Sequence, residues 1–317
     1  MSDVRRPDVP GVDADKPTEI PAAGWWQVIR RAWAEAKADQ VPLLAAGVAF
    51  FGFLSLFPAV VAGVLAYGLV ADPARIRNQV KDLAAAMPAS GRDLLLQQLD
   101  ALTSAPRQGL GIGLAIAVVA ALWSASGGAG YLLTAVNLAY DEDESRGFVR
   151  RKLLALGMTL GAIVFVLLAI ALFAAGAAIG NDVATPVRIL LEAVRLVLAV
   201  VLITVALAVT YRLGPDRDAP RIRWVSTGAV VATVIWLIAS IGFSVYVETF
   251  GNYAKTYGSL AAVVVLMLWL WLTAYAVLLG AEINAETEQQ TARDTTKGEP
   301  RTLGQRNAVK ADSIPRQ

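Results

Sequence analysis

Glu282 and Asn284 are the two polar side chains whose position points most directly to chemistry, because they follow at once on a long apolar run that ends at Ala281. A carboxyl group there could bind a proton or a cation at the mouth of a transport path. It could equally pair with a basic residue at the membrane surface. Both interpretations stay open at the level of sequence.

A second candidate is the small-residue segment SASGGAG, residues 124–130, which interrupts another apolar stretch. Its glycines predict a broken helix whose free backbone groups face a cavity, as in many transporters. The alternative is close packing of two helices through small residues. The candidate residues of this region are Trp123, Ser124, Ser126, Gly127 and Gly128, with Asn137 and Tyr140 near the end of the same stretch.

Two further features lie in the first and last apolar runs. Pro58 stands near the middle of the first, where a proline removes one backbone hydrogen bond and kinks a helix. Tyr257, Gly258 and Ser259 open the last one and are candidates for a pathway or for a structural role. The alternative for Tyr257, with Tyr253 and Lys255, is an interfacial anchor.

The residue types exclude several kinds of chemistry. The chain has no cysteine and no histidine, so we predict no catalytic residue, no cofactor site and no metal site built on them. The acidic run DEDE, residues 141–144, would have to supply any nuclease metal, but adjacent residues of a polar turn point in different directions. A net charge of only +2 favours no nucleic-acid partner.

The elements that must position these residues are membrane-spanning helices. Of 317 residues, 56% are hydrophobic and 17% are charged, which is typical of a membrane protein. Crossing the hydrocarbon layer takes roughly 20 apolar residues in a helix. We therefore predict an all-α polytopic helical bundle in a lipid bilayer, with about six transmembrane helices near residues 43–70, 109–135, 153–180, 189–211, 225–247 and 259–281.

The remaining segments are polar. Residues 1–24 and 285–317 are predicted to be disordered tails around a membrane domain at 25–284. Residues 25–40 are predicted to form an amphipathic helix, lying on the membrane or packed on the bundle, with Trp25, Ile29, Trp33 and Ala36 on one stripe. An amphipathic helical hairpin outside the membrane is expected at residues 71–108.

The distribution of Lys and Arg predicts that both termini are cytoplasmic. Basic residues concentrate before the first span, between the second and third, between the fourth and fifth, and after the sixth. The insert at 71–108 argues against this orientation, because it carries the basic residues Arg75, Arg77, Lys81, Arg92 and Arg107. Nothing in the sequence sets the oligomeric state, so a homo-oligomer stays open.

Four strings in the same order resemble the YihY/BrkB family of bacterial integral membrane proteins, sometimes labelled ribonuclease BN-like. The resemblance covers residues 25–287 and rests on AAGVAFFGFLSLFP, on WSASGG followed by VNLAY, on YRLGPDR, and on YGSLAAVVVLMLWLWLTAYAVLLGAEINAE. It implies a six-helix fold in the bacterial inner (plasma) membrane. It supplies no substrate, and the family's ribonuclease label finds no matching site here.

Three functions are compatible with these observations. The leading hypothesis is a transporter or permease of unknown substrate, with a path past the first and second spans. The alternative is a non-transporting scaffold or envelope-integrity factor, similar to serum-resistance virulence factors. A membrane-bound ribonuclease is the third, and it rests only on residues 141–144.

Overall fold

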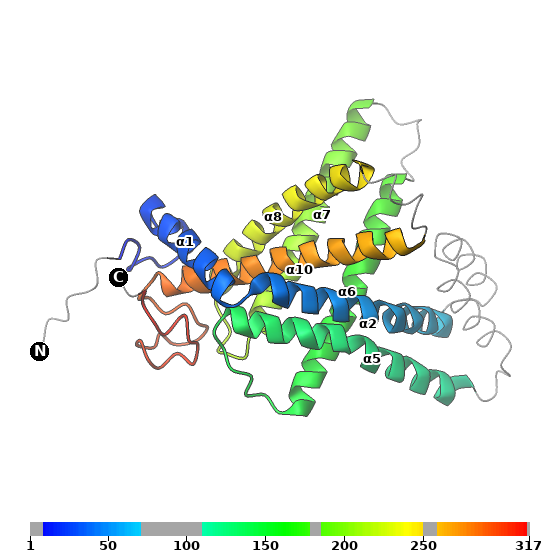
Figure 1. Cartoon of the computed structure of the whole chain (residues 1–317), viewed down its shortest axis with the longest axis horizontal. Coiled ribbons are helices and arrows are strands. Elements are labelled where there is room, and N and C mark those ends of the chain that lie inside the picture. Colours follow the sequence, from blue (N-terminus) through cyan, green and yellow to red (C-terminus); the bar gives the residue numbers. More distant parts are fainter. Residues whose placement is uncertain (1–8, 71–109, 178–184, 250–258, 316–317) are drawn as a thin grey trace, which may run out of the picture.

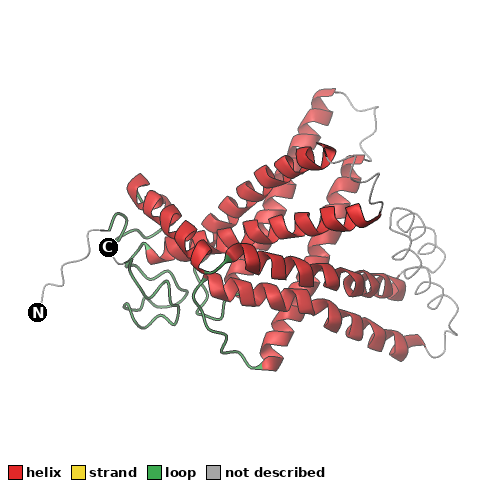
Figure 2. Cartoon of the chain, in the orientation of Figure 1, coloured by secondary structure: helices red, strands yellow, loops and turns green. Residues whose placement is uncertain are grey.

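The computed structural model describes residues 9–70, 110–177, 185–249 and 259–315. Throughout these ranges the chain forms helices and connecting loops, with no β-strand (Figure 2). The expected all-α class is confirmed. The described elements are η1 (Pro17–Glu19), α1 (Ala22–Ala38), α2 (Val41–Val70), α5 (Leu110–Ala139), α6 (Phe148–Ala177), α7 (Thr185–Leu213), α8 (Ile222–Thr249) and α10 (Ser259–Gln289).

Six of these helices are long and apolar enough to cross a membrane, which confirms the expected multi-pass class. Each has 28 to 31 residues, hence a length of roughly 45 Å against the roughly 30 Å of the hydrocarbon layer. The helices therefore extend into the polar regions. The largest difference from the predicted spans is at α10, which continues to Gln289 instead of ending near residue 281.

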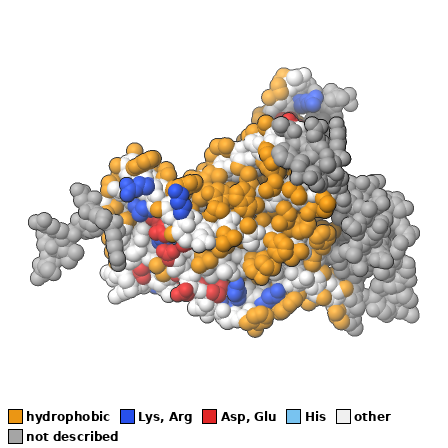
Figure 3. All heavy atoms as spheres, in the orientation of Figure 1, with side chains coloured by type: hydrophobic (Ala, Val, Ile, Leu, Met, Phe, Trp, Pro, Cys, Tyr) orange, Lys and Arg blue, Asp and Glu red, His pale blue; other side chains and the backbone are white. Residues whose placement is uncertain are grey.

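The helices form an open fan. Helices α2, α5 and α10 run side by side, α8 packs on α10, and α7 packs on α8 (Figure 1). Helix α6 contacts both α5 and α7, so it closes the chain of neighbours. On the face seen in Figure 3, apolar side chains cover most of the described helices. Large side chains such as Leu196 and Ile238 are more than half exposed, as expected for a surface that lipid covers.

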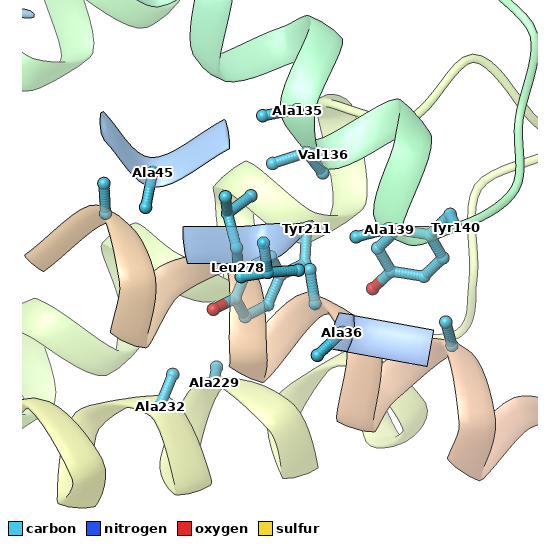
Figure 4. Packing of buried hydrophobic residues seen from close by; sticks show 14 of the residues in the cluster. Ala36, Ala45, Ala135, Val136, Ala139, Tyr140, Tyr211, Ala229, Ala232 and Leu278 are labelled. Carbon is cyan, nitrogen blue, oxygen red and sulfur yellow. The ribbon is translucent and has the colours of Figure 1, made fainter. Parts of the chain in front are cut away.

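The core is made of small side chains around two tyrosines. Alanines of α1, α2, α5, α8 and α10 bring the helices close, and Tyr140 and Tyr211 fill the space between α5, α7 and α10 (Figure 4). Small residues let backbones approach closely, which is the main source of helix association in lipid. The labelled cluster lies toward the same end of the fan as α1.

At that end the polar segments of the chain pack together, and we call it the polar end. It consists of residues 9–20, α1, the connections 140–147 and 214–221, and residues 290–315 (Figure 1). Helix α1 buries Val28 and Ala32 and leaves Trp26, Ile29 and Trp33 exposed. It therefore packs on the bundle, chiefly on α10, while its other face is free to contact lipid headgroups.

Residues 290–315 differ from the disordered tail that composition predicts. Arg306 is buried, and its guanidinium donates to the carbonyls of Arg293, Ala292 and Ala311, around which the segment folds. The segment also pairs with the connection 214–221, for example through the amide of Arg221, which donates to the carbonyl of Thr295. The prediction of disorder rests on the low apolar content of the segment. It cannot detect a segment that is ordered by hydrogen bonds and ion pairs of individual charged side chains.

Candidate functional site

The SASGGAG segment does not interrupt its helix, so the predicted break in the second span is wrong. Helix α5 runs without a gap from Leu110 to Ala139. The amide of Gly128 donates to Ser55 Oγ of α2 at 2.9 Å, and a Cβ on Gly128 would lie 3.2 Å from the Cα of Gly52. The structure thus places this segment in a close helix contact, the alternative interpretation of the small residues.

The neighbours of Gly128 follow the same pattern. Ser126 is buried and donates back to the carbonyl of Trp123 in its own helix. That carbonyl also accepts from Lys152 Nζ of α6 at 2.9 Å, and the ammonium lies 4.4 Å from the centre of the Trp123 ring. Trp123 and Lys152 therefore join α5 to α6. Ser124 and Gly127, two further candidates, lie in the same part of α5 as Ser126 and Gly128. Pro58 lies inside α2.

Asn137, near the end of α5, connects two loops that are far apart in sequence. Its side-chain nitrogen donates to Glu144, and its side-chain oxygen accepts from the amide of Asp216. Asp216 in turn accepts from the amide and hydroxyl of Ser145. Although burial opposes it, the hydrogen bonds from Ser145 and the charge of Arg146 lower the pKa of Asp216. The connections 140–147 and 214–221 thus form one charged network.

Tyr140 lies beside a buried ion pair. Arg217 donates to Glu288 of α10 at 2.5 Å, and both side chains are at most 1% exposed. The guanidinium carbon is 4.5 Å from the centre of the Tyr140 ring. Breaking such a pair by removing one partner typically costs about 3–5 kcal/mol. The Tyr140 hydroxyl and two of the guanidinium nitrogens, Nε and Nη1, have no hydrogen-bond partner.

Asn284 joins α10 to α8. Its side-chain oxygen accepts from the amide of Gly228 at 2.6 Å, and its side-chain nitrogen donates to the carbonyl of Val225 at 3.1 Å. One turn earlier, the backbone of Gly280 lies against Tyr211 and Ala232. All polar atoms of the Asn284 side chain are used in packing, so this residue has a structural role.

Glu282 is different, because it is completely buried and no amide, ammonium, guanidinium or hydroxyl group donates to its carboxyl oxygens; its side-chain neighbour is the carboxyl group of Asp39, with which it can share a proton. The charges of Asp39, Lys310 and Glu286 act on its carboxyl group. Leaving a buried polar group unsatisfied costs about 1–3 kcal/mol, and more for a charged one. This carboxyl group therefore needs a proton, a cation or another donor to compensate it.

Asp39, at the end of α1, belongs to the same cluster and was missed by sequence reasoning. One of its carboxyl oxygens is buried without a partner. Burial and, next, the charges of Asp141 and Glu35 raise the pKa of Asp39, against the effects of Lys310 and Glu282. Nothing in the sequence signals this, because Asp39 stands in an ordinary polar turn between two helices.

The acidic run at residues 141–144 does not form a metal site in the structure. Asp141 pairs with Lys310, Glu142 accepts from the amide of Val309, and Glu144 pairs with Arg146. Among the described residues no group of three or more Asp and Glu side chains is arranged to hold a metal ion. These carboxylates hold the loops of the polar end together.

Several candidates stay apart from this cluster. Tyr257 and Gly258 and the predicted insert at 71–108 lie outside the described residues, and Ser259 is the first residue of α10. At the other end of the bundle Glu192 pairs with Arg195 at 2.6 Å. This pair lines a cavity of about 310 Å³ between α6 and α7. The structure thus brings Tyr140 close to Glu282 and Asn284 and places Asn137 one turn before Tyr140, whereas Glu192 and Arg195 lie apart from them.

The fold and this polar interior define a multi-pass helical membrane protein. The chain belongs to the family described as virulence factor BrkB, whose family model matches residues 32–303. The resemblance seen in the sequence strings is thereby confirmed.

Named relatives are bacterial. The chain is 34% identical over 248 residues to the ribonuclease-like protein YfkH of Bacillus subtilis, covering 76% of this chain and 87% of the relative. It is 37% identical over 86 residues to a UPF0761 membrane protein of Tolumonas auensis, covering 26% of this chain and 28% of the relative. It is also 35% identical over 98 residues to a UPF0761 membrane protein of Alteromonas mediterranea, covering 31% and 33%. No solved structure matches the chain.

Proposed function

We propose that this protein is a transporter of the bacterial plasma membrane whose path reaches the polar end beside Glu282. The observation that carries the proposal is the buried Glu282 carboxyl group, which lies beside the carboxyl group of Asp39 and receives no amide, ammonium, guanidinium or hydroxyl donor. Ionisable residues inside membrane helices are costly and typically mark ion or substrate paths. The path is placed at the end of α10 and not along the second span, because Gly128 packs directly on α2.

The proposal includes an orientation, with both termini and the polar end in the cytoplasm. In its support, residues 9–20, the basic connections 140–147 and 214–221, and residues 290–315 lie at one end of the fan (Figure 1). Cytoplasmic segments of membrane proteins carry the excess of Lys and Arg. Glu282 would then lie at the inner mouth of the path.

The test is flux through purified protein in sealed vesicles. We expect the wild type to move at least one member of a panel of inorganic cations, amines and metabolites. Glu282→Gln should lower that flux about tenfold or more, since it removes the ionisable group from the path. Glu192→Gln is the matched control, because Glu192 is a partly exposed carboxylate at the other end of the bundle.

The outcomes separate clearly. No flux for any member of the panel means that transport should be abandoned. Flux that is equal in the wild type and the Glu282→Gln variant removes Glu282 from the path while leaving transport intact.

A second candidate is a non-transporting envelope scaffold. It is favoured by the contact between α2 and α5, where Gly128 leaves no room for a methyl group, and by the ordered surface of residues 290–315. Crosslinking in intact cells distinguishes the two functions. A stable protein partner bound through residues 290–315, together with absent flux, would support the scaffold.

A further inference from the structure

The ammonium group of Lys310 is held by carboxylates from three different elements. Its Nζ lies 2.7 Å from Glu286 of α10, 2.9 Å from Asp141 of the connection after α5, and 3.5 Å from Glu35 of α1. The side chain of Lys310 is only 3% exposed. An ammonium group has three N–H donors, and three acceptors converge on it here.

The three carboxylates around Lys310 carry more negative charge than its single ammonium group neutralises. Asp39 and Glu282 belong to the same cluster, because their carboxyl groups neighbour each other and interact electrostatically with Lys310, and no amide, ammonium, guanidinium or hydroxyl group donates to their buried oxygens. Arg31, a second cation at Glu286, is already bonded to Glu286 and Gln290. The cluster therefore fits a cation with several N–H donors better than an anion or a neutral ligand.

Lys310 reaches this position from a segment without helix or strand. The amide of the preceding residue, Val309, donates to the carboxylate of Glu142, and its carbonyl accepts from the hydroxyl of Ser313. The Arg306 turn that precedes it is held by Asp312, which accepts from the amides of Gly304 and Arg306. The family match ends at residue 303, so Lys310 lies beyond the part shared with the family.

We propose that the acidic cluster of Glu35, Asp39, Asp141, Glu282 and Glu286 is a binding site for primary ammonium compounds, and that Lys310 of the chain's own C-terminal segment occupies it in this structure. The inference deepens the proposed function, on which its meaning for transport rests, because it names the substrate class. A ligand with a primary ammonium group must displace Lys310 to bind. The C-terminal segment is then a tethered competitor of the substrate.

Binding of n-butylammonium to the purified full-length protein tests the site, since this ion matches the lysine side chain beyond Cα. Lys310→Ala should bind it about tenfold more tightly than the wild type, because no tethered ammonium competes. Tetramethylammonium, which has no N–H donor, should not bind to either protein. Lys297→Ala, which removes an exposed lysine of the same segment, should behave like the wild type.

Hydrogen exchange in the wild type tests the displacement. Saturating n-butylammonium should speed exchange of the amides of residues 304–315 about threefold or more, at constant ionic strength. Tetramethylammonium chloride at the same concentration should leave that exchange unchanged. If Lys310→Ala does not fold, Lys310→Met replaces it in the binding test, because it keeps an unbranched side chain only one atom shorter and removes the ammonium group.

Two results would overturn the inference. The first is a Lys310 variant that is folded and binds no n-butylammonium. The second is a variant that binds while wild-type exchange stays constant, because Lys310 is then a fixed structural counterion. Neither measurement requires transport, so absent flux with intact binding removes only the transporter, and absent binding with intact flux removes only this site.

Discussion

Two glycines of α5, Gly128 and Gly130, have the same residue type and opposite surroundings. A Cβ on Gly128 would lie 2.8 Å from Ser55 Oγ and 3.2 Å from the backbone of Gly52, whereas a Cβ on Gly130 meets nothing within 4 Å. Gly128 therefore sets the distance between α2 and α5. At Gly130 there is room for a side chain, so this glycine does not set a distance between helices.

Alanine should lower stability at Gly128 and should not lower it at Gly130. Gly128→Ala should lower the free energy of unfolding by about 1–3 kcal/mol, because the added methyl group pushes two packed helices apart. Gly130→Ala should leave it unchanged or raise it by up to about 1 kcal/mol, because alanine favours helix over glycine. Thermal unfolding of the purified protein in detergent measures both. Equal destabilisation by the two variants would contradict the close α2–α5 contact.

The same pair shows what sequence can predict at the scale of residues. The run of small residues indicates either a cavity or close packing, but which glycine faces a neighbour depends on how α2 and α5 are aligned. Likewise the position of Glu282 after an apolar run marks it as a candidate. Its surroundings cannot be predicted from the sequence, because Asp39 and Lys310, which interact with its carboxyl group, come from distant segments that no local pattern connects to it.

At the scale of elements, α10 shows how helix ends depend on their partners. Hydropathy predicts an end near residue 281, yet the helix continues through Glu286 and Glu288 to Gln289. Both glutamates are neutralised by pairing, Glu286 with Arg31 and Lys310, and Glu288 with Arg217. The six apolar spans are predictable from the sequence, because each is an apolar run long enough to be recognised as a spanning helix without knowledge of its neighbours. Their polar extensions are not, since they rest on contacts between loops.

The contact between the connection 140–147 and the C-terminal segment should depend on pH through Glu142. Burial raises the pKa of Glu142 to about 7, against an opposing hydrogen bond from Val309. Between its ordinary pKa of 4.5 and about 7 the folded protein holds a proton that the unfolded chain has lost, so stability falls as the pH rises through this window.

We expect Glu142→Gln to reduce this pH dependence. Its effect should be about 1 kcal/mol, because the carboxyl group is partly exposed and solvent screens it. Unfolding temperatures of both proteins between about pH 5 and pH 8 provide the measurement. A wild-type slope that Glu142→Gln leaves unaltered would assign the pH dependence to another group.

At the scale of the whole molecule, the described chain has a polar end and an apolar fan. Charged side chains gather near α1 on the face seen in Figure 3, and apolar ones cover the helices beyond it. The N-terminal residues, two of the connections and the C-terminal segment all lie at the polar end. The start of α7, with Arg188, lies at the far end of the fan (Figure 1).

Cysteine labelling can test the orientation directly, because the natural chain contains no cysteine. Lys16→Cys and Glu299→Cys, both at exposed positions of the polar end, should react with a membrane-impermeant maleimide only after cells are permeabilised. Arg188→Cys should react in intact cells. The unmodified protein is the control for background labelling, and the reverse pattern would invert the proposed topology.

The interlocked glycines of α8 and α10 limit how the molecule can change shape. Gly228 and Gly280 leave no room for a methyl group, and Asn284 fastens the two backbones with two hydrogen bonds. If α8 slid along α10, side chains of one helix would clash with the backbone of the other at these glycines. We therefore expect α8 and α10 to move together as one rigid unit. A change of shape must therefore take place at other helix contacts, and the cavities of about 310 Å³ between α6 and α7 and about 330 Å³ between α7 and α8 provide free volume for it.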